Sequence, residues 1–183
     1  MKNRRTRRRF FCLFKKISMK KLLACLLLIP ALAFIQATIP VSVKDFKPAF
    51  GEWRGSLTYM DYSSEKPYTM PANIIINKDK SNDHRLILDF QYPDEPKANE
   101  KDTLVISNDG LRIDDAMVIS KEKSVGGVLQ IITEEPGVDG NDNRKAVLRH
   151  IYSISKRAFF SRKEVKFDGQ EKFIIRNEYK MSR

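Results

Sequence analysis

The sequence predicts an all-β protein, an antiparallel up-and-down β-barrel that follows an N-terminal export segment. Three observations predict this fold. Beyond position 50, short segments alternate apolar and polar residues, and no long stretch keeps the apolar period of a helix. Prolines and glycines divide the chain into segments of strand length. These segments follow one another without a long crossover connection, which favours a barrel over a sandwich.

Nine or ten strands are expected. They cover residues 52–62, 69–77, 84–92, 103–107, 116–121, 127–134, 145–155, 158–167 and 171–180, with a further short strand from Leu111. The alternation is clearest in the third of these, where one face carries Leu86, Leu88, Phe90 and Tyr92. Asn108-Asp109-Gly110 and Asp168-Gly169 are typical hairpin turns, so the strands that flank each turn are expected to pair.

The net charge of the protein is concentrated in its first residues. The chain of 183 residues has 34 Lys and Arg against 23 Asp and Glu, a net charge of +11. Residues 1–21 contain ten of the basic residues and no acidic one, so the rest is nearly neutral and lacks the electrostatic surface of a nucleic-acid-binding protein. Cys12 and Cys25 lie before residue 40, which excludes disulfides, thiolate metal sites and cysteine nucleophiles from the rest of the chain.

The N-terminal region has the pattern of an export signal. Basic residues precede an uncharged apolar run over residues 22–39, and Ala31-Leu32-Ala33 offers a cleavage site. We expect residues 1–37 to be a signal peptide, with Met19 as an alternative start of translation. Thr6-Arg7-Arg8-Arg9-Phe10-Phe11 resembles a twin-arginine motif, but its distance from the apolar run favours ordinary Sec export.

An uncleaved membrane anchor is the alternative reading of the same segment. The apolar run over residues 22–39 just reaches the length of a membrane-spanning helix. Lipidation at Cys25 is disfavoured, because the apolar run continues after it. Residues 38–183 are then a single β-barrel domain in the periplasm or on the outer face of the cell envelope. Contact with the membrane is expected only through the N-terminal segment.

Gly51-Glu52-Trp53 opens the first expected strand. Residues 45–50 before it suit a short helical turn, and Arg176 lies in the last strand. In these features the sequence resembles the lipocalin and calycin group of β-barrels, in which a G-x-W motif opens the first strand and a basic residue of the last strand packs over the tryptophan. The resemblance implies a barrel closed at one end with a small apolar ligand inside. Trp53 is accordingly expected to be buried at the barrel base, near Arg176 or another basic residue of the last strand.

The sequence contains no catalytic or metal-binding motif, and no cofactor or metal is predicted. His84 is expected to be solvated, and His150 to lie at the edge of the core with a hydrogen-bond partner. Residues 139–143 begin like a calcium loop but lack the glycine and glutamate of an EF-hand, so a hairpin turn is expected. Asp61 is expected at an exposed rim.

Charge also divides along the domain, since residues 144–183 are basic and residues 38–143 are acidic. One interpretation is a basic stripe that binds anionic lipid or polysaccharide. In a closed barrel, however, the first and last strands are neighbours, so the two sets of charges offset each other. We therefore expect the lysines of this region to be largely solvent-facing: Lys163, Lys166, Lys172 and Lys180.

The expected function is binding of a small hydrophobic or amphipathic ligand inside the barrel. Five candidate ligand-binding residues lie on apolar strand faces: Tyr59, Phe90, His150, Tyr152 and Tyr179. The same side chains also suit a solid core, and the protein is then a structural or interaction module of the cell envelope without a ligand cavity. A barrel enzyme that uses Asp61 or His150 is the third hypothesis.

Overall fold

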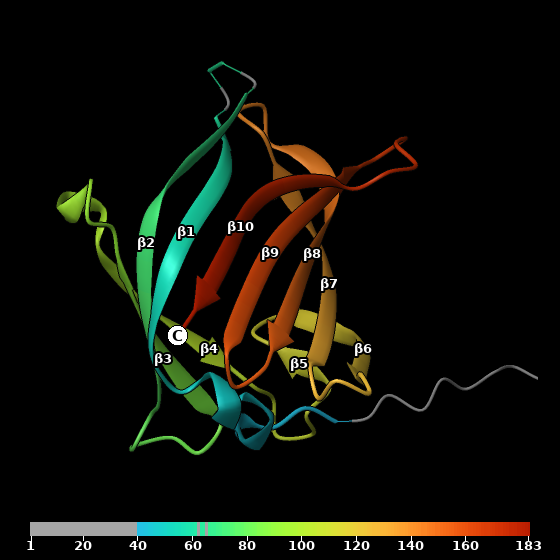
Figure 1. Ribbon diagram of the computed structural model, residues 1–183. Coiled ribbons are helices and arrows are strands. Elements are labelled where there is room, and N and C mark those ends of the chain that lie inside the picture. Colours follow the sequence, from blue (N-terminus) through green and yellow to red (C-terminus); the bar gives the residue numbers. More distant parts are fainter. Residues whose placement is uncertain (1–39, 62, 65) are drawn as a thin grey trace, which may run out of the picture. The chain divides into compact units, whose positions relative to one another are not determined.

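A computed structural model describes residues 40–61, 63–64 and 66–183 (Figure 1). Ten antiparallel strands run up and down and form a nearly closed barrel, which confirms the predicted fold class. The expected signal peptide or anchor, residues 1–37, lies outside the described residues. Within the described ranges, no helix combines the length and the hydropathy that a membrane crossing requires.

Two short 3-10 helices accompany the strands: η1 (Val43–Ala49) and η2 (Pro96–Ala98). The strands are β1 (Gly51–Asp61), β2 (Lys66–Lys78), β3 (Arg85–Gln91), β4 (Glu100–Val105), β5 (Arg112–Ile113), β6 (Ala116–Lys123), β7 (Leu129–Asp139), β8 (Arg144–Ile154), β9 (Ala158–Phe167) and β10 (Ile174–Ser182). Their order in the sheet is β4-β3-β2-β1-β10-β9-β8-β7-β6-β5. Each half of the chain therefore forms a series of adjacent hairpins, and the two halves meet where β1 pairs with β10.

Strand β7 continues beyond the end that the sequence predicts. Pro136 and Gly137 are typical strand breakers, yet Pro136 pairs with Val147 and Gly137 pairs with Ala146. Pro136 lies past the last β6 partner of β7, at an edge position where a proline is tolerated. A Cβ at Gly137 would lie 2.6 Å from Leu148 Cδ1, so the glycine gives this leucine room.

The closure of the barrel differs on its two sides. β1 and β10 form a continuous ladder that begins at Arg54↔Ser182. β4 and β5 are not neighbours in the sheet, and the isolated bridge Ile106↔Ile113 links the chain segments beside them. The interior is therefore walled on most sides, with a gap in the sheet between its edge strands β4 and β5.

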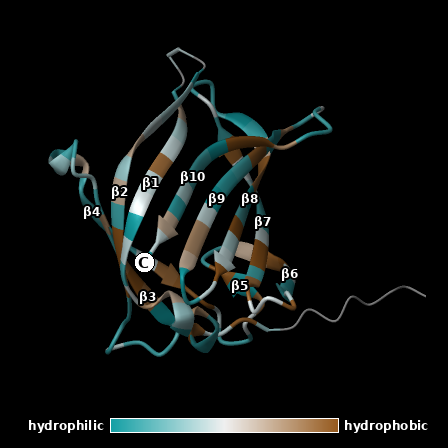
Figure 2. Ribbon diagram, viewed as in Figure 1, coloured by the Kyte–Doolittle hydropathy of each residue, from teal (hydrophilic) through white to brown (hydrophobic). Residues whose placement is uncertain are grey.

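One end of the barrel, which we call the base, is covered by η1 (Figure 1). The hydrophobic core lies at this end and combines η1 with strands from both halves of the chain, among them Phe46, Trp53, Ile74, Ile131 and Phe159. Trp53 is 1% exposed, and its Nε1 donates a hydrogen bond to the Ala49 carbonyl at 2.6 Å. Figure 2 shows hydrophilic and hydrophobic segments alternating along the strands, as expected for a sheet with one face toward a core.

The cation over Trp53 is Arg183, whereas the sequence analysis favoured Arg176. The Arg183 guanidinium carbon lies 4.1 Å from the centroid of the Trp53 ring. Its Nη1 and Nη2 donate to the carbonyls of Phe50 and Pro48, at 2.6 and 2.7 Å. Arg176 lies at the start of β10, far from the base, because β10 runs toward the base and only its last residues reach Trp53.

Ion pairs cross the outer face of the sheet from β7 to β10. Arg149 lies 2.5 Å from Glu134 and 3.7 Å from Glu164, measured from guanidinium nitrogen to carboxylate oxygen. Arg162 lies 3.2 Å from Glu164 and also pairs with Glu178. These arginines therefore have acidic partners within the same sheet and do not form a free basic stripe.

A carboxylate holds the turn between β2 and β3. Asp79 accepts hydrogen bonds from the backbone N and the Oγ of Ser81, both at 2.7 Å, and from Nε of Arg85 at 2.6 Å. These interactions, the Ser81 hydroxyl first among them, lower the pKa of Asp79 to about 2. The ionised carboxylate is therefore stabilised by folding.

Asp79 is expected to make stability depend on pH in acid. A carboxylate whose pKa is lowered by folding contributes stability above its unfolded pKa, near 3.9, and loses that contribution as the pH falls through about 2. The thermal unfolding midpoint of the wild type should therefore fall more steeply from about pH 4 to about pH 2 than that of Asp79→Asn, which binds no proton at this site. Parallel curves for the two proteins would contradict this assignment.

Gly110 lies where the described chain enters the barrel, and Gly110→Ala is expected to destabilise the fold. Its φ is +71°, its carbonyl accepts the Val41 N–H at 2.9 Å, and a Cβ would lie 2.5 Å from the Val41 oxygen. Strain and overlap together should lower the free energy of unfolding by roughly 1–3 kcal/mol. Gly127→Ala is the matched control, because Gly127 has φ +80° but nothing within 4 Å of its Cβ position. Equal losses in urea unfolding would argue against the Val41 contact.

Candidate functional site

The end of the barrel opposite the base, which we call the mouth, is bordered by the β1–β2, β7–β8 and β9–β10 turns (Figure 1). Inward-facing apolar and aromatic side chains near this end are only partly buried: Tyr59, Phe90, Leu148 and Tyr179. A solid core would bury these side chains fully. The base half of the barrel is thus packed, and the mouth half is open to solvent.

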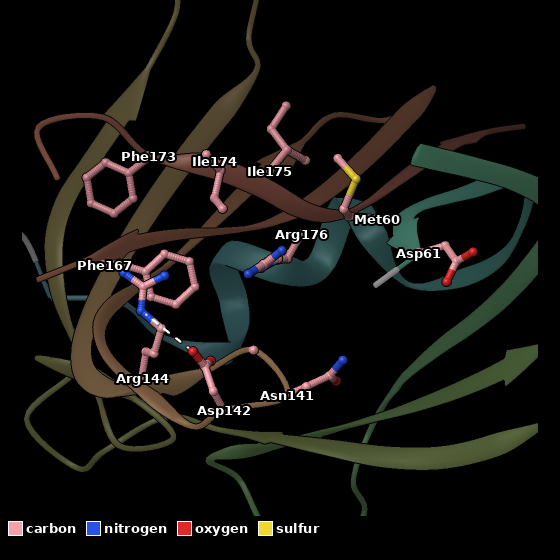
Figure 3. A pocket seen from close by; sticks show the side chains of 11 residues that line it. Met60, Asp61, Asn141, Asp142, Arg144, Phe167, Phe173, Ile174, Ile175 and Arg176 are labelled. Carbon is pink, nitrogen blue, oxygen red and sulfur yellow. Dashed lines mark ion pairs between the residues drawn. The ribbon is translucent and has the colours of Figure 1, made fainter. Parts of the chain in front are cut away.

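Two adjoining cavities occupy the mouth. The inner cavity, of about 420 Å³, is lined by Tyr59, Met60, Asp61, Ser63, Asp139, Asn141, Lys163, Arg176 and Asn177. The outer cavity, of about 730 Å³, shares four of these residues and reaches Phe167 and Phe173. Figure 3 shows the outer cavity with Phe173, Ile174 and Ile175 on one side and Asn141 and Asp142 on the other. The interior of the barrel is therefore accessible from this end.

An arginine lies between the two cavities. Arg176 pairs with Asp139 of β7, and its guanidinium carbon lies 5.4 Å from the centroid of the Phe167 ring. The register of β10 against β9 shifts between Ile175 and Asn177, so Arg176 is the extra residue of a bulge. A bulge redirects a side chain relative to simple alternation, and here Arg176 contacts the mouth.

A row of polar side chains follows the inner face of five neighbouring strands. We call it the polar belt: Tyr59 of β1, Asn177 of β10, Lys163 of β9, His150 of β8 and Thr133 of β7. Each residue is the direct cross-strand partner of the next. Within the described part of the chain, none of the five side chains forms a hydrogen bond or an ion pair. The belt can therefore offer its polar atoms to a bound molecule.

Two members of the belt are in unusual surroundings. Thr133 is 1% exposed, and its Oγ1 has no hydrogen-bond partner among the described residues. Burial, and then the charge of Lys163, lower the pKa of His150 below its ordinary value, so the imidazole is neutral at pH 7. The ring of His150 lies 6.4 Å from that of Tyr152. Among the described residues, His150 therefore has an aromatic contact and not the hydrogen bond that was expected from the sequence.

Aromatic rings lie between the polar belt and the core of the base. Phe90 and Tyr179 are 5.2 Å apart between ring centroids, although β3 and β10 are separated in the sheet by two strands. The hydroxyls of Tyr179 and Tyr92 are hydrogen-bonded at 2.7 Å. Tyr152 lies deeper, 5.8 Å from the ring of Phe46 in η1. Burial raises the pKa of Tyr152 and of Tyr179, so both hydroxyls stay protonated at neutral pH.

The five candidate residues thus occupy two levels of the interior. Tyr59 and His150 belong to the polar belt, whereas Phe90, Tyr152 and Tyr179 belong to the aromatic layer below it. Four residues that contribute to these levels were not among the candidates: Tyr92, Thr133, Lys163 and Asn177.

The prediction that Lys163 faces solvent was wrong. Its side chain faces the barrel interior and lines the inner cavity. A signal for its position was present in the sequence. Phe159, Val165 and Phe167 are buried on the same face of β9, two or four residues from Lys163. The alternation of β9 therefore predicts that Lys163 faces the interior, whereas a lysine is normally expected at a solvent-exposed position.

Asp61 and the turn after β7 were the remaining candidates for catalytic or metal chemistry. Hydrogen bonds from Ser64 and Ser63 lower the pKa of Asp61, so it is an ionised carboxylate at the end of its strand and not a proton donor at neutral pH. Residues 140–143 form the hairpin turn between β7 and β8. No group of three or more His, Cys, Asp or Glu side chains suited to a metal ion occurs in the ranges that the structure describes.

Similarity to known proteins is confined to the fold. No protein-family model matches the chain, and no curated protein matches it. Among solved structures, the chain is similar to that described as "Crystal Structure of Rv2717c from M. tuberculosis", with a TM-score of 0.45 and 13% sequence identity. The alignment covers 77% of this chain and 96% of the other. These comparisons assign the chain to no family, and its lipocalin resemblance remains a prediction.

Proposed function

We infer that the protein is an exported β-barrel that binds a small amphipathic molecule in the mouth half of its interior. The observation that carries this inference is the partial exposure of inward-facing rings, among them Tyr59, which lines a cavity of about 420 Å³. Binding sites for small molecules are typically concave and largely apolar, with a few polar groups that orient the ligand. The mouth combines both kinds of surface.

The energetics favour an occupant with an apolar part. Partly exposed aromatic surface inside the barrel remains in contact with water when no ligand is present. Covering it stabilises a complex by about 25 cal/mol for each Å² of apolar surface removed from water. Export rests on the basic and apolar pattern of residues 1–39, and a location in the periplasm or at the outer face of the envelope is part of the proposal.

Fluorescence of the neutral probe N-phenyl-1-naphthylamine tests the binding function. We expect saturable binding by the wild type and a several-fold loss of affinity in Phe90→Ala, which removes a ring from the inner wall. Phe160→Ala is the matched control, because Phe160 lies on the outer face, where its ring contacts Arg162. Absence of saturable binding, together with only the apo mass in native mass spectrometry of protein from its own envelope, would rule out this function.

A structural or interaction role in the envelope is the second candidate function. One observation favours it. Apolar side chains on the outer face beside the gap are exposed, namely Val105 of β4 and Met117 and Ile119 of β6. Exposed apolar side chains beside a strand edge are typical of protein contacts. Crosslinking in intact cells from cysteines introduced at Met117 or Ile119 should then trap a partner, and a protein that stays uncrosslinked would argue against this role.

A further inference from the structure

We propose that the ligand carries an oxyanion, a carboxylate or a phosphate, and that the polar belt binds this group with Lys163 as its counter-charge. This proposal rests on the ligand-binding function and specifies the chemical class of the ligand. It also specifies the ligand's orientation, with the oxyanion toward the mouth and the apolar part against the aromatic layer.

Lys163 has no counter-charge among the described residues. The side chain is partly buried on the inner face of β9, and no described carboxylate lies within ion-pair distance of it. By contrast, Arg149 and Arg162 on the outer face and Arg176 at the mouth all pair with carboxylates. Moving a cation away from water is unfavourable unless an anion replaces the lost hydration. Within the described part of the chain, Lys163 thus lacks the carboxylate partner that these three partly buried arginines have.

The polar belt is rich in hydrogen-bond donors. All five side chains carry donors: two hydroxyls, an amide, an imidazole N–H and an ammonium group. Asn177 and His150 are the direct cross-strand neighbours of Lys163 on either side. Directly opposed residues have Cβ atoms about 5 Å apart, so these three side chains can reach different oxygens of one oxyanion. Hydrogen bonds from charged and neutral donors together are the usual way in which proteins bind such a group.

The buried hydroxyl of Thr133 also lacks a partner in the ranges that the structure describes. Its Oγ1 is enclosed and has no partner among the described residues, although buried polar atoms are normally hydrogen-bonded. Thr133 is the direct neighbour of His150 on the inner face of β7. This unpartnered group points to a polar occupant at the level of the belt and is independent of the charge of Lys163.

The carboxylates of the interior restrict where an anion can bind. Asp139 lines the inner cavity with Lys163 and is paired with Arg176. Asp61, an ionised carboxylate of the same cavity, opposes an anion there. Glu135 lies on the same face of β7 as Thr133, one inward position nearer the mouth, and opposes an anion. Glu100 and Asp102 share the inner face of β4, where both are exposed to water. The positive charge nearest the centre of the belt is therefore that of Lys163.

The order of the polar belt and the aromatic layer along β10 determines the orientation of the ligand. Asn177 of the belt precedes Tyr179 of the aromatic layer, and β10 runs from the mouth to the base. A ligand whose oxyanion binds the belt thus places its apolar part against Tyr179 and Phe90. An amphiphile with an unbranched tail satisfies this arrangement.

Calorimetric titration of the purified protein with ligands of nearly equal tail length tests the proposal. Decanol and decyltrimethylammonium have a ten-carbon tail and decanoate a nine-carbon tail, so the shorter tail works against decanoate, and acetate supplies the carboxylate without a tail. We expect decanoate to bind at least tenfold more tightly than decanol, and acetate to show no measurable binding. Decyl phosphate should behave like decanoate if the site recognises oxyanions in general, and weaker binding would restrict the site to carboxylates.

Variants locate the effect at the belt. Lys163→Gln should remove the preference for decanoate over decanol without weakening decanol binding, and Lys163→Arg should retain it. Glu135→Gln should strengthen decanoate binding several-fold. Lys166→Gln is the matched control, because Lys166 lies near the ring of Phe173 on the outer face of the same strand. Circular dichroism establishes that each variant is folded.

The outcomes separate this proposal from the general binding function. Equal affinity for decanoate and decanol, or tighter binding of decyltrimethylammonium, would overturn the oxyanion site and leave ligand binding intact. If neither decanoate nor decanol binds, both proposals fail. A preference for decanoate that persists in Lys163→Gln would also overturn the assignment of this lysine.

Discussion

Trp53→Ala is expected to lower the free energy of unfolding by about 3–5 kcal/mol, a large share of the roughly 5–15 kcal/mol that stabilises a typical domain. Trp53 joins β1 to the covering helix η1 and to the end of the chain. Its ring is fully buried beside Phe159, its Nε1 bonds to Ala49, and Arg183 packs over it. Removing the indole creates a cavity at the base and leaves the Ala49 carbonyl without this donor.

Urea unfolding measures this loss, and Arg54→Ala is its control. Arg54 is the next residue of β1, lies on the opposite face and is exposed. Its replacement should change the free energy of unfolding by less than about 0.5 kcal/mol. Native fluorescence is an independent check, because Trp53 is the single tryptophan of the chain. Emission typical of an indole in water, or ready quenching by iodide, would contradict its burial.

Gly55→Ala is expected to have the second largest effect, roughly 2–3 kcal/mol, because it forces apart the strands that close the barrel. A Cβ at Gly55 would lie 1.9 Å from the carbonyl oxygen of Lys180 and 3.0 Å from Cα of Met181. Both atoms belong to the backbone of β10, so no side-chain rotation relieves the overlap. The pairing of β1 with β10 must then shift along its length.

Amide hydrogen exchange locates this effect, and Gly126→Ala is its control. Protection should fall along β1 and β10 and stay unchanged in the β7–β8 hairpin. A Cβ at Gly126 would meet only the hydroxyl of Ser124 within 4 Å, at 3.8 Å. Wild-type stability in Gly55→Ala would show that the two strands tolerate a wider spacing.

The sequence predicts the fold well because the barrel is built from local signals. Alternation in β3 and the turn at residues 108–110 are properties of neighbouring residues, and both are present in the structure, although the strands that flank the turn are not neighbours in the sheet and are linked by the isolated bridge Ile106↔Ile113. Burial of Trp53 behind a helical turn likewise follows from adjacent residues. A series of such hairpins leaves little choice of topology, since sequential strands usually lie side by side.

The site depends on features that alternation alone does not determine. The bulge before Asn177 redirects Arg176, and its position depends on the register of β10 against β9. Arg183 reaches Trp53 because β10 continues to Ser182, whereas the expected strand ended at residue 180. The lack of a partner for Thr133 is visible only when all neighbouring strands are in place. These features arise from pairing between distant segments, which a single sequence does not reveal.

The pairing of β1 with β10 also determines how the chain can fold. Arg54 pairs with Ser182, near the two ends of the described chain, whereas every other strand pair in the sheet joins neighbours in sequence. The hairpins on either side can form early because the loops that they close are short. Closure of the cylinder requires an encounter across almost the whole domain, which makes it the slow step. Until β10 and Arg183 have been synthesised, β1 has an unpaired edge and Trp53 lacks the arginine that covers it, so the newly made chain is prone to aggregate up to that point.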